Sequence, residues 1–293
     1  MKRIKLFAAC TLMLCAASCD KNEPVEKELE ETVITAEPEW EDTVVTISFA
    51  RIYTEPMQAR TRNTDLASVI NRLDVWIADD GGNTIDFHQV KTDENFGVIT
   101  TMLNKTKTYT LYAMAHKCDA AATLADGIIT FPDNKVTHSL YYTTTFSPAT
   151  TTTINAEMKR IVGMFRIETT DAVPDAAKKM RFTISDVYDK WSLEDGPNHK
   201  LDRVSTINIG SKNNDGTAAF SVYAIVPTAE TTHTVTIEAL DENDAPVQTP
   251  LVLEGVKMKA GYKTTYRGTF FTDKSFSITL TAEDWSEYGV VDF

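Results

Sequence analysis

The sequence has few cysteines, and their positions argue against a disulfide framework. Only four occur in 293 residues, and three of them, Cys10, Cys15 and Cys19, lie near the start. Cys118 alone stands in the body of the chain, so the sequence contains no CxxC metal pair and no set of cysteines that could staple a fold. We expect Cys118 to be a buried or inert thiol, because a catalytic thiol needs a histidine partner and a lowered pKa.

Positive charge and long apolar runs are also scarce. Lys and Arg total 29 against 42 Asp and Glu, which gives a formal net charge of −13. Nucleic-acid binding depends on clustered Lys and Arg, so this balance argues against a nucleic-acid partner. The apolar run from Leu6 to Cys15 has roughly ten residues, whereas a membrane-spanning helix needs about 20. No later segment approaches that length without a charge, so we expect no transmembrane helix in the mature chain.

Catalytic sequence motifs are missing as well. The histidines are scattered through the chain: His88, His116, His138, His199 and His233. The sequence contains no HExxH, GxSxG elbow, P-loop or GxGxxG. Asp79 and Asp80 are adjacent acids, but two glycines follow them, and this composition is typical of a hairpin turn. We therefore expect no enzyme activity, no cofactor and no catalytic residues.

One stretch suggests a metal, ALDENDAPV at 239–247. Three of its side chains offer oxygen ligands and echo the wording of calcium-bridged cadherin linkers: Asp241, Asn243 and Asp244. The stretch fails as an EF-hand loop, because Pro246 stands where the turn glycine belongs and Val252 where the bidentate glutamate belongs. We expect a hairpin turn and no metal site.

What the first residues do contain is an export signal. Lys2, Arg3 and Lys5 precede the short apolar run, and small residues follow it, which is the layout of a signal peptide over residues 1–18. The sequence Ala-Ala-Ser-Cys at 16–19 resembles a bacterial lipobox, in which the cysteine is acylated and becomes the first residue of the mature chain. The alternative is an ordinary secretory signal with a stray cysteine. At about 0.8 kcal/mol per buried methylene, several acyl chains on Cys19 would anchor the protein stably.

Acidic residues dominate the segment after Cys19. Residues 20–42 hold ten acids against Lys21 and Lys27, and removal of residues 1–18 with their three positive charges takes the formal net charge from −13 to −16. Such a segment repels itself and buries little apolar surface. We expect residues 19–42 to form an extended tether. In Bacteroidetes lipoproteins, which this start resembles, acidic residues after the lipidated cysteine accompany display on the outer face of the outer membrane.

Most of the remaining sequence has the pattern of β-strands. Nine runs are rich in β-branched and aromatic residues: 43–49, 73–78, 109–115, 165–169, 180–185, 218–226, 233–240, 262–271 and 276–282. Turn residues such as Asp126-Gly127 separate them. The helical signal is confined to short pieces such as 65–72, with Thr64 or Asp65 as its cap. Regular short strands without long alternating helices predict an all-β protein built from β-sandwiches.

The chain after the tether is long enough for two domains. Roughly 250 residues remain, and ordinary domains have about 100–150. The polar stretch SPATTTT at 147–153 interrupts the strand pattern, and Glu157 to Arg160 opens a new strand-rich block. We therefore expect an N-terminal β-sandwich over 43–157 and a C-terminal β-sandwich over 158–293.

A family resemblance rests on the order and spacing of several segments. They are LDVWIADDGGNTI (73–85), DENFGVITTML (93–103), YTLYAMAHKC (109–118), ITFPDNKVTHSLYY (129–142), MKRIVGMFRIETTDAVPDAAKKMRF (158–182), GYKTTYRGTFF (261–271) and ITLTAEDWSEYGVVDF (278–293). Together they resemble the fimbrillin-like lipoproteins of Bacteroidetes, specifically the FimB-type anchor and minor-subunit family of type V fimbriae. The likeness spans nearly the whole mature chain.

The resemblance implies a fold, a role and partners. It implies two tandem transthyretin-like β-sandwiches and a structural subunit of a cell-surface fimbria, a pilus that serves cell adhesion. The subunit would be held in the outer membrane through acylated (palmitate-type) Cys19. Its partners would be other fimbrial subunits, joined by strand addition, in which an extended strand completes the open sheet of a neighbour.

The resemblance also makes arginine positions relevant. Stalk fimbrillins of this kind lose their lipid and first strand to an arginine-specific protease, whereas the anchor type keeps both. Arg51, Arg60 and Arg62 follow the first expected strand and are the candidate processing sites. Because the likeness is closer to the anchor type, we expect no cleavage, with strand 43–49 retained in its own sheet. A proteolytically matured stalk or tip subunit is the alternative within the family.

Another class of function stays open, that of a surface glycan-binding lipoprotein. Such a protein would need exposed aromatic side chains, and the tryptophans are Trp40, Trp76, Trp191 and Trp285. Trp76 and Trp285 fall in or near expected strands, where core packing explains them. Trp191, in DKWSLEDG, is therefore the candidate glycan contact. An anchored hydrolase is a third class, and no motif supports it.

Overall fold

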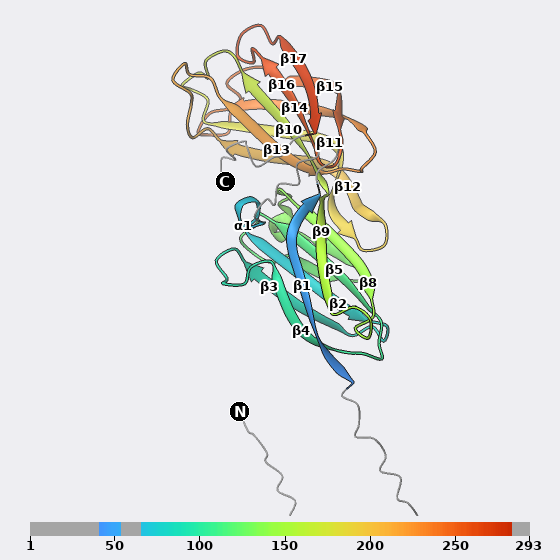
Figure 1. Cartoon of the computed structure of the whole chain (residues 1–293). Coiled ribbons are helices and arrows are strands. Elements are labelled where there is room, and N and C mark those ends of the chain that lie inside the picture. Colours follow the sequence, from blue (N-terminus) through green and yellow to red (C-terminus); the bar gives the residue numbers. More distant parts are fainter. Residues whose placement is uncertain (1–40, 54–65, 283–293) are drawn as a thin grey trace, which may run out of the picture. The chain divides into compact units, whose positions relative to one another are not determined.

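The computed structural model describes residues 41–53 and 66–282, and these form an almost entirely β-structure (Figure 1). The first sheet contains β1 (Asp42–Tyr53), β2 (Arg72–Asp79), β3 (Thr84–Val90), β4 (Val98–Asn104), β5 (Tyr109–His116), β8 (Leu140–Phe146) and β9 (Thr153–Arg160). The second contains β10 (Val162–Thr169), β11 (Lys179–Ser192), β12 (Gly196–Asn208), β13 (Ala219–Ile225), β14 (Thr231–Leu240), β15 (Leu251–Met258), β16 (Tyr262–Gly268) and β17 (Phe276–Ala282), together with the short hairpin β6 (Thr123–Ala125) and β7 (Ile128–Thr130). The prediction of an all-β protein is confirmed.

The first sheet folds back on itself into two layers. One layer has the order β3-β2-β5-β8 and the other β9-β1-β4, and they meet through only two register pairs between β8 and β9. Alternation explains the packing: in β9, every second residue from Ile154 to Arg160 is buried and the residues between are exposed. The inward side chains of both layers form one apolar core, which contains Ile47 and Met158 from one layer and Val75 and Leu111 from the other. This is the arrangement of a β-sandwich.

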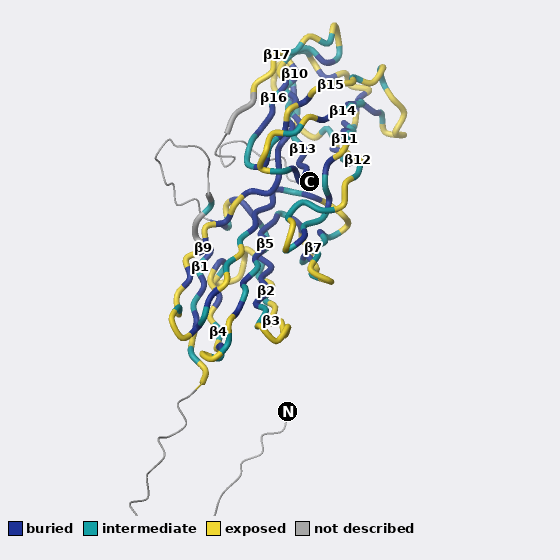
Figure 2. Tube along the Cα trace, turned by 90° about the vertical axis from the view of Figure 1, so that its right-hand side faces the viewer, coloured by how far each residue is buried: buried dark blue, intermediate teal, exposed yellow. Residues whose placement is uncertain are grey.

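The second sheet has the same two-layer construction. The layers β12-β11-β14-β15 and β13-β10-β16-β17 meet through the single register pair Tyr188↔Ile225. Phe165, Phe182 and Tyr266 lie in its core, with the rings of Phe165 and Tyr266 5.5 Å apart. Figure 2 shows the buried residues of both sheets in dark blue. The transthyretin-like assignment of these sandwiches stays a prediction.

A third apolar cluster joins the two sheets. The hairpin β6–β7 leaves the first sheet after β5 and pairs with β11, with Ile129 opposite Trp191. Around it lie buried residues from both sheets, among them Trp76, Met114 and Ile225. The described residues, 41–53 and 66–282, accordingly belong to one compact unit.

Several element boundaries differ from the predictions. The expected helix at 65–72 is only the single turn α1 (Leu66–Val69), because strand β2 begins at Arg72. The tether expected to reach residue 42 overlaps β1, which begins at Asp42. The first sheet continues through Arg160, beyond the proposed boundary at 157, and the division into two domains stays a prediction. Within the described residues, no helix is long and apolar enough to cross a membrane.

Candidate assembly surfaces

Strand β1 lies inside its layer and not at an edge. It pairs antiparallel with β4, from Asp42↔Asn104 to Ser48↔Val98, and parallel with β9 on its other side. Val45, Ile47 and Phe49 are each fully buried. Removing β1 would therefore expose the apolar core of the first sheet and the edges of β4 and β9 that pair with β1. The prediction that a strand occupies 43–49 is confirmed.

The predicted processing and lipidation sites are only partly within the described residues. Arg51 belongs to β1, and its backbone is in register with Glu157 of β9, after a shift in pairing that follows Ser48. Cys19, Arg60 and Arg62 lie outside the described residues. The roles of all four stay predictions. The structure adds that a protease acting at Arg51 would have to cut within a paired strand.

Strand β17 covers the outer edge of β16, and no other described strand pairs with the outer edge of β17 itself. It pairs antiparallel with β16 from Gly268↔Phe276 to Tyr262↔Ala282. Ser277, Ile278 and Thr279 are all exposed, Ile278 to 63%, whereas Phe276 packs against the second core. A β-carbon on Gly268 would lie 1.8 Å from the carbonyl oxygen of Ser275, so only glycine allows this close return of the chain.

The connection from β16 to β17 is fixed by one carboxylate. Asp171 accepts hydrogen bonds from the backbone amides of Phe270, Phe271 and Thr272 at 2.7–2.9 Å. Phe270 is fully buried. The start of the turn is thus anchored in the second core, whereas β17 itself is held by its pairing with β16.

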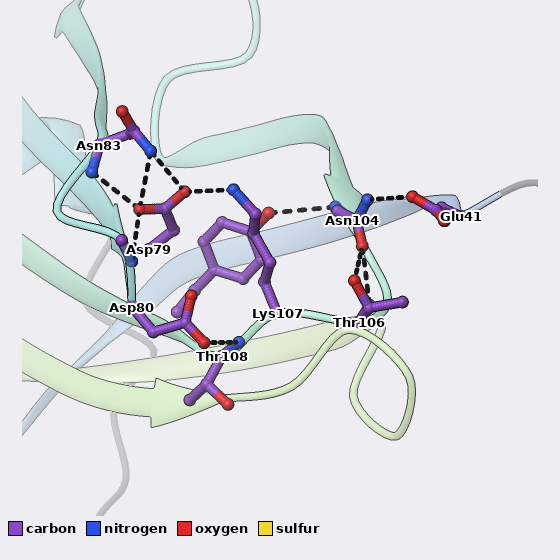
Figure 3. Close-up of polar contacts among 10 residues, drawn as sticks. Glu41, Asp79, Asp80, Asn83, Asn104, Thr106, Lys107 and Thr108 are labelled. Carbon is purple, nitrogen blue, oxygen red and sulfur yellow. Dashed lines mark hydrogen bonds and ion pairs between the residues drawn. The ribbon is translucent and has the colours of Figure 1, made fainter.

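A polar cluster surrounds the start of β1 (Figure 3). Asp79 accepts hydrogen bonds from the backbone amides of Gly81 and Asn83, and Lys107 lies 2.6 Å from its other carboxylate oxygen. The ion pair with Lys107, followed by the bonds from Asn83, holds the pKa of Asp79 well below its ordinary value. Glu41 accepts a 3.0 Å bond from Asn104, which ties the entry of β1 to the end of β4. The adjacent acids at 79–80 therefore belong to a turn, as predicted.

A buried network links β2 to the segment after β5. Asp74 is fully buried and lies 2.7 Å from Nε2 of His116, 2.7 Å from Nδ1 of His88 and 2.8 Å from the backbone amide of Ala122. Burial alone would raise the pKa of Asp74, but the bonds from His116 and Ala122 outweigh it and lower the pKa. Burial opposes protonation of His116, and the bond to Asp74 reverses this and raises its pKa. The network orients the 117–122 segment, which sequence reasoning missed.

Two further expectations concern Cys118 and the 239–247 stretch. Cys118 is buried, as predicted, and its thiol lies 3.2 Å from the carbonyl oxygen of Lys135. Asp241 accepts bonds from the amides of Asn243 and Ala245, and Asp244 pairs with Lys179 at 2.7 Å. These side chains thus complete a turn and an ion pair. Over the described part of the chain, no group of three or more His, Cys, Asp or Glu could hold a metal ion.

The tryptophans have different surroundings. Trp76 is buried in β2, consistent with core packing. Trp191 is half-buried at the end of β11, where its ring lies 5.1 Å from that of Tyr141 and packs over Gly196. It lines a cavity of about 770 Å³ together with Tyr142 and Asp195. Trp40 and Trp285 lie outside the described residues. A glycan contact at Trp191 stays a prediction.

Comparison with solved structures identifies proteins with this fold. A candidate adhesin from Bacteroides ovatus aligns with a TM-score of 0.52 at 10% identity, over 83% of this chain and 95% of that one. A candidate adhesin from Bacteroides thetaiotaomicron aligns at 0.50 and 12% identity, over 81% and 95%. A candidate polysaccharide-binding protein from the same species aligns at 0.50 and 9% identity, over 82% and 96%.

These similarities establish the fold over most of the chain. No protein-family model and no curated protein sequence matches this chain. The three structural neighbours are described as adhesins and as a polysaccharide-binding protein, and at 9–12% identity they show a shared fold alone. The fold alone leaves the role of the chain to be argued from its residues.

Proposed function

We propose that this chain is a structural subunit of a cell-surface fimbria, held in the outer membrane through acylated Cys19, and that it serves as an anchor or minor subunit. The observation that carries the anchor role is the position of β1. This strand is paired on both sides and buries Val45, Ile47 and Phe49 completely. A subunit that keeps β1 keeps a complete first core and, with it, the link to its lipid.

The proposed assembly step is strand addition at the outer edge of β17. Exposed edges offer unpaired backbone groups to an incoming strand, and natural monomers usually protect them with charged residues. From Phe276 to Thr279, β17 carries no charged side chain, and Ile278 is 63% exposed. An extended segment of a neighbouring subunit could therefore pair along this edge and cover Ile278.

We propose no catalytic turnover. Two acids with lowered pKa values have structural partners: Asp74 holds His116 and the 117–122 segment, and Asp79 closes its own turn. A general acid or base needs instead a reachable substrate atom within hydrogen-bond distance. The structural neighbours described as adhesins support the same interpretation.

Two alternative functions can be weighed against this proposal. A glycan-binding lipoprotein is favoured by the cavity beside Trp191 and by a neighbour described as a candidate polysaccharide-binding protein. Against it, the Trp191 ring is half-buried and does not form an open aromatic platform. A stalk or tip subunit would be matured by cleavage at Arg51, Arg60 or Arg62.

Co-isolation of fimbrial subunits from intact cells tests the proposal. We would compare the full-length protein with Ile278→Lys, which places a charge on the β17 edge, and with Val252→Lys as a matched control. Val252 is a similarly exposed apolar residue, at 54%, on edge strand β15. We expect Ile278→Lys to lose the partner subunits and Val252→Lys to retain them. Retention of the partners by Ile278→Lys would contradict assembly at this edge.

A binding measurement separates the main alternative. Micromolar affinity of the purified protein for an oligosaccharide, lost on Trp191→Ala, would favour the glycan-binding lipoprotein. Release of Cys19→Ala protein from the membrane fraction is expected under either reading of the function, and it tests the lipid anchor by itself.

A further inference from the structure

A cavity of about 510 Å³ lies where the segment 117–138 meets β12 and β13. Small-molecule sites are concave and commonly have about 300–1,000 Å³, so this cavity has the size of a ligand site. Lys117 and Thr137 line it from one side, and Arg203, Thr206 and Ser221 from the other. It is separate from β17 and from the cavity beside Trp191, and the fimbrial proposal does not use it.

The most buried cation of this lining is Arg203, which is only 8% exposed. Its guanidinium donates a 2.9 Å bond to the carbonyl oxygen of Asn134 and a long 3.5 Å contact to that of Val136. Its Nε atom is buried without a hydrogen-bond partner. Burial lowers the pKa of Arg203, and the charge of the buried carboxylate of Asp189 opposes this, although no ion pair joins the two side chains within the described residues. A buried charge is costly unless an anion pairs with it, and Asp189 acts on this guanidinium only from beyond ion-pair distance.

The remaining lining is polar, with one aromatic ring. Hydroxyl and amide side chains contribute hydrogen-bonding groups: Asn71, Thr137, Ser205, Thr206 and Ser221. The ring of Tyr223 also lines the cavity and lies parallel to that of His138, at an interplanar angle of 6°. His138 accepts a bond from Arg160, and burial lowers its pKa well below the ordinary value, so it adds no positive charge. The acids of the lining, Asp119 and Asp133, are exposed, whereas Arg203 is buried.

We propose that this cavity binds a sugar that carries a carboxylate group. Arg203 supplies the planar donor fork that matches a carboxylate, and this geometry distinguishes arginine from lysine. The hydroxyl and amide side chains supply partners for the hydroxyl groups of the sugar ring. The buried cation selects the acidic sugar, and the surrounding polar groups select a sugar over a simple carboxylic acid.

Calorimetric titration of the full chain in detergent tests the ligand class. The probes are glucuronate, glucose as its neutral counterpart, acetate as the carboxylate alone, and a short Glu-containing peptide. We expect glucuronate to bind with a Kd of about 1 mM or tighter, and at least about tenfold more tightly than the other three. Equal binding of glucose and glucuronate would overturn the proposal, and so would tighter binding of acetate or of the peptide.

Variants identify the residues responsible. Arg203→Met should abolish glucuronate binding, whereas Lys200→Gln, which removes a cation from an exposed position on the same strand, should leave it unchanged. Because Arg203 also holds the 134–136 carbonyls, its loss could disturb the fold. Thr206→Asp avoids this by adding a like charge at an exposed lining position, and it should weaken glucuronate binding about tenfold, with Thr206→Asn as the neutral control. Unchanged glucuronate binding by Thr206→Asp would overturn the proposal.

Discussion

The two sheets of this chain repeat one order of pairing. Strand β1 lies between antiparallel β4 and parallel β9, and β10 lies between antiparallel β13 and parallel β16. In the second layers, β2 lies between β3 and β5, and β11 between β12 and β14. Strands β8 and β15 complete these layers in the same way. Taken in chain order, β10 to β16 thus repeat the pairing of β1, β2, β3, β4, β5, β8 and β9, although the two halves share no obvious sequence repeat.

The halves differ at the edge beside the last shared strand. In the second half, β17 pairs along all of β16. In the first half, the corresponding edge of β9 meets β8 only at Lys159 and Arg160, and no other described strand pairs there. Strand β17 is therefore an addition to the shared pairing order. A sandwich of this kind can therefore hold an extra strand at this edge while its other strand pairings stay the same.

The largest expected effects come from the first strand of each half. Phe49→Ala in β1 and Phe165→Ala in β10 each remove a fully buried ring, which should cost about 3–5 kcal/mol. Because β7 pairs with β11 and an apolar cluster spans both sheets, we expect one unfolding transition that both variants shift. Thermal unfolding followed by calorimetry checks this. Two transitions, each moved by only one variant, would show that the halves unfold independently.

The second effect concerns a buried acid in each half. Asp74→Asn should lower the free energy of unfolding by about 2 kcal/mol, because it weakens hydrogen bonds that are wholly buried. The control is Asp189→Asn in the second half, whose partner His199 is largely exposed, and it should cost less. Chemical denaturation of both variants measures the difference. An equal or larger loss of unfolding free energy in Asp189→Asn would contradict the expectation that the Asp74 network contributes more to stability.

The Asp74 network also predicts a pH window. The pKa of Asp74 is lowered from 3.8, so its contribution is present above pH 3.8 and is lost as pH falls through the folded value. The pKa of His116 is raised from 6.5, so its contribution is present below pH 6.5 and is lost as pH rises through the folded value. The stability gap between wild type and Asp74→Asn should therefore be widest between these two values. A gap independent of pH would contradict this assignment.

A smaller loss of stability is expected when the connection between β16 and β17 is weakened, and it should affect β17 more than the core of the second sheet. Gly268→Ala forces a methyl group against the Ser275 carbonyl, which should cost about 1–3 kcal/mol and loosen β17. Gly210→Ala is the control, because nothing lies within 4 Å of the added carbon. Hydrogen exchange should speed up in β16 and β17 while β10 keeps its protection. Uniform loss of protection across the second sheet would mean that β17 is part of the core.

The smallest effect is expected at the turns. Lys107→Met removes the ion pair with Asp79, and Lys179→Met removes the pair with Asp244 in the second half. These lysines lie near the surface, where ion pairs contribute little, so each Tm should fall by less than in Gly268→Ala. A larger fall for Lys107→Met would show that the cluster at the start of β1 supports the whole first sandwich.

Sequence patterns predicted the buried strands better than the exposed ones. The run 43–49 alternates apolar and polar residues and is β1, whereas GPNHKLDRVSTIN contains turn formers and charges yet forms β12. The long partner β11 imposes that strand through pairing, and a pattern within one segment does not contain this information. The polar stretch SPATTTT (147–153) hides the start of β9, which begins at Thr153 and not at Glu157.

The site residues depended even more on contacts between distant segments. Trp191 is half-buried because β7, some sixty residues earlier, pairs beside it. Arg203 has the sequence context of an ordinary strand residue, yet it is buried and donates a hydrogen bond to Asn134 in the distant turn at 132–136. The turn acids at 79–80 were predictable, because their partners are neighbours in the chain. Contacts between neighbours in the chain could thus be predicted from the sequence, whereas contacts between distant segments could not.

The measurement that tests the central claim most directly is mass spectrometry of the N-terminus of the protein on the cell surface. If the chain is an anchor that retains β1 between β4 and β9, the mature form begins at Cys19 and carries the mass of acyl chains. A surface form that begins at residue 52, 61 or 63, after Arg51, Arg60 or Arg62, would contradict the anchor assignment and make the chain a matured stalk or tip subunit.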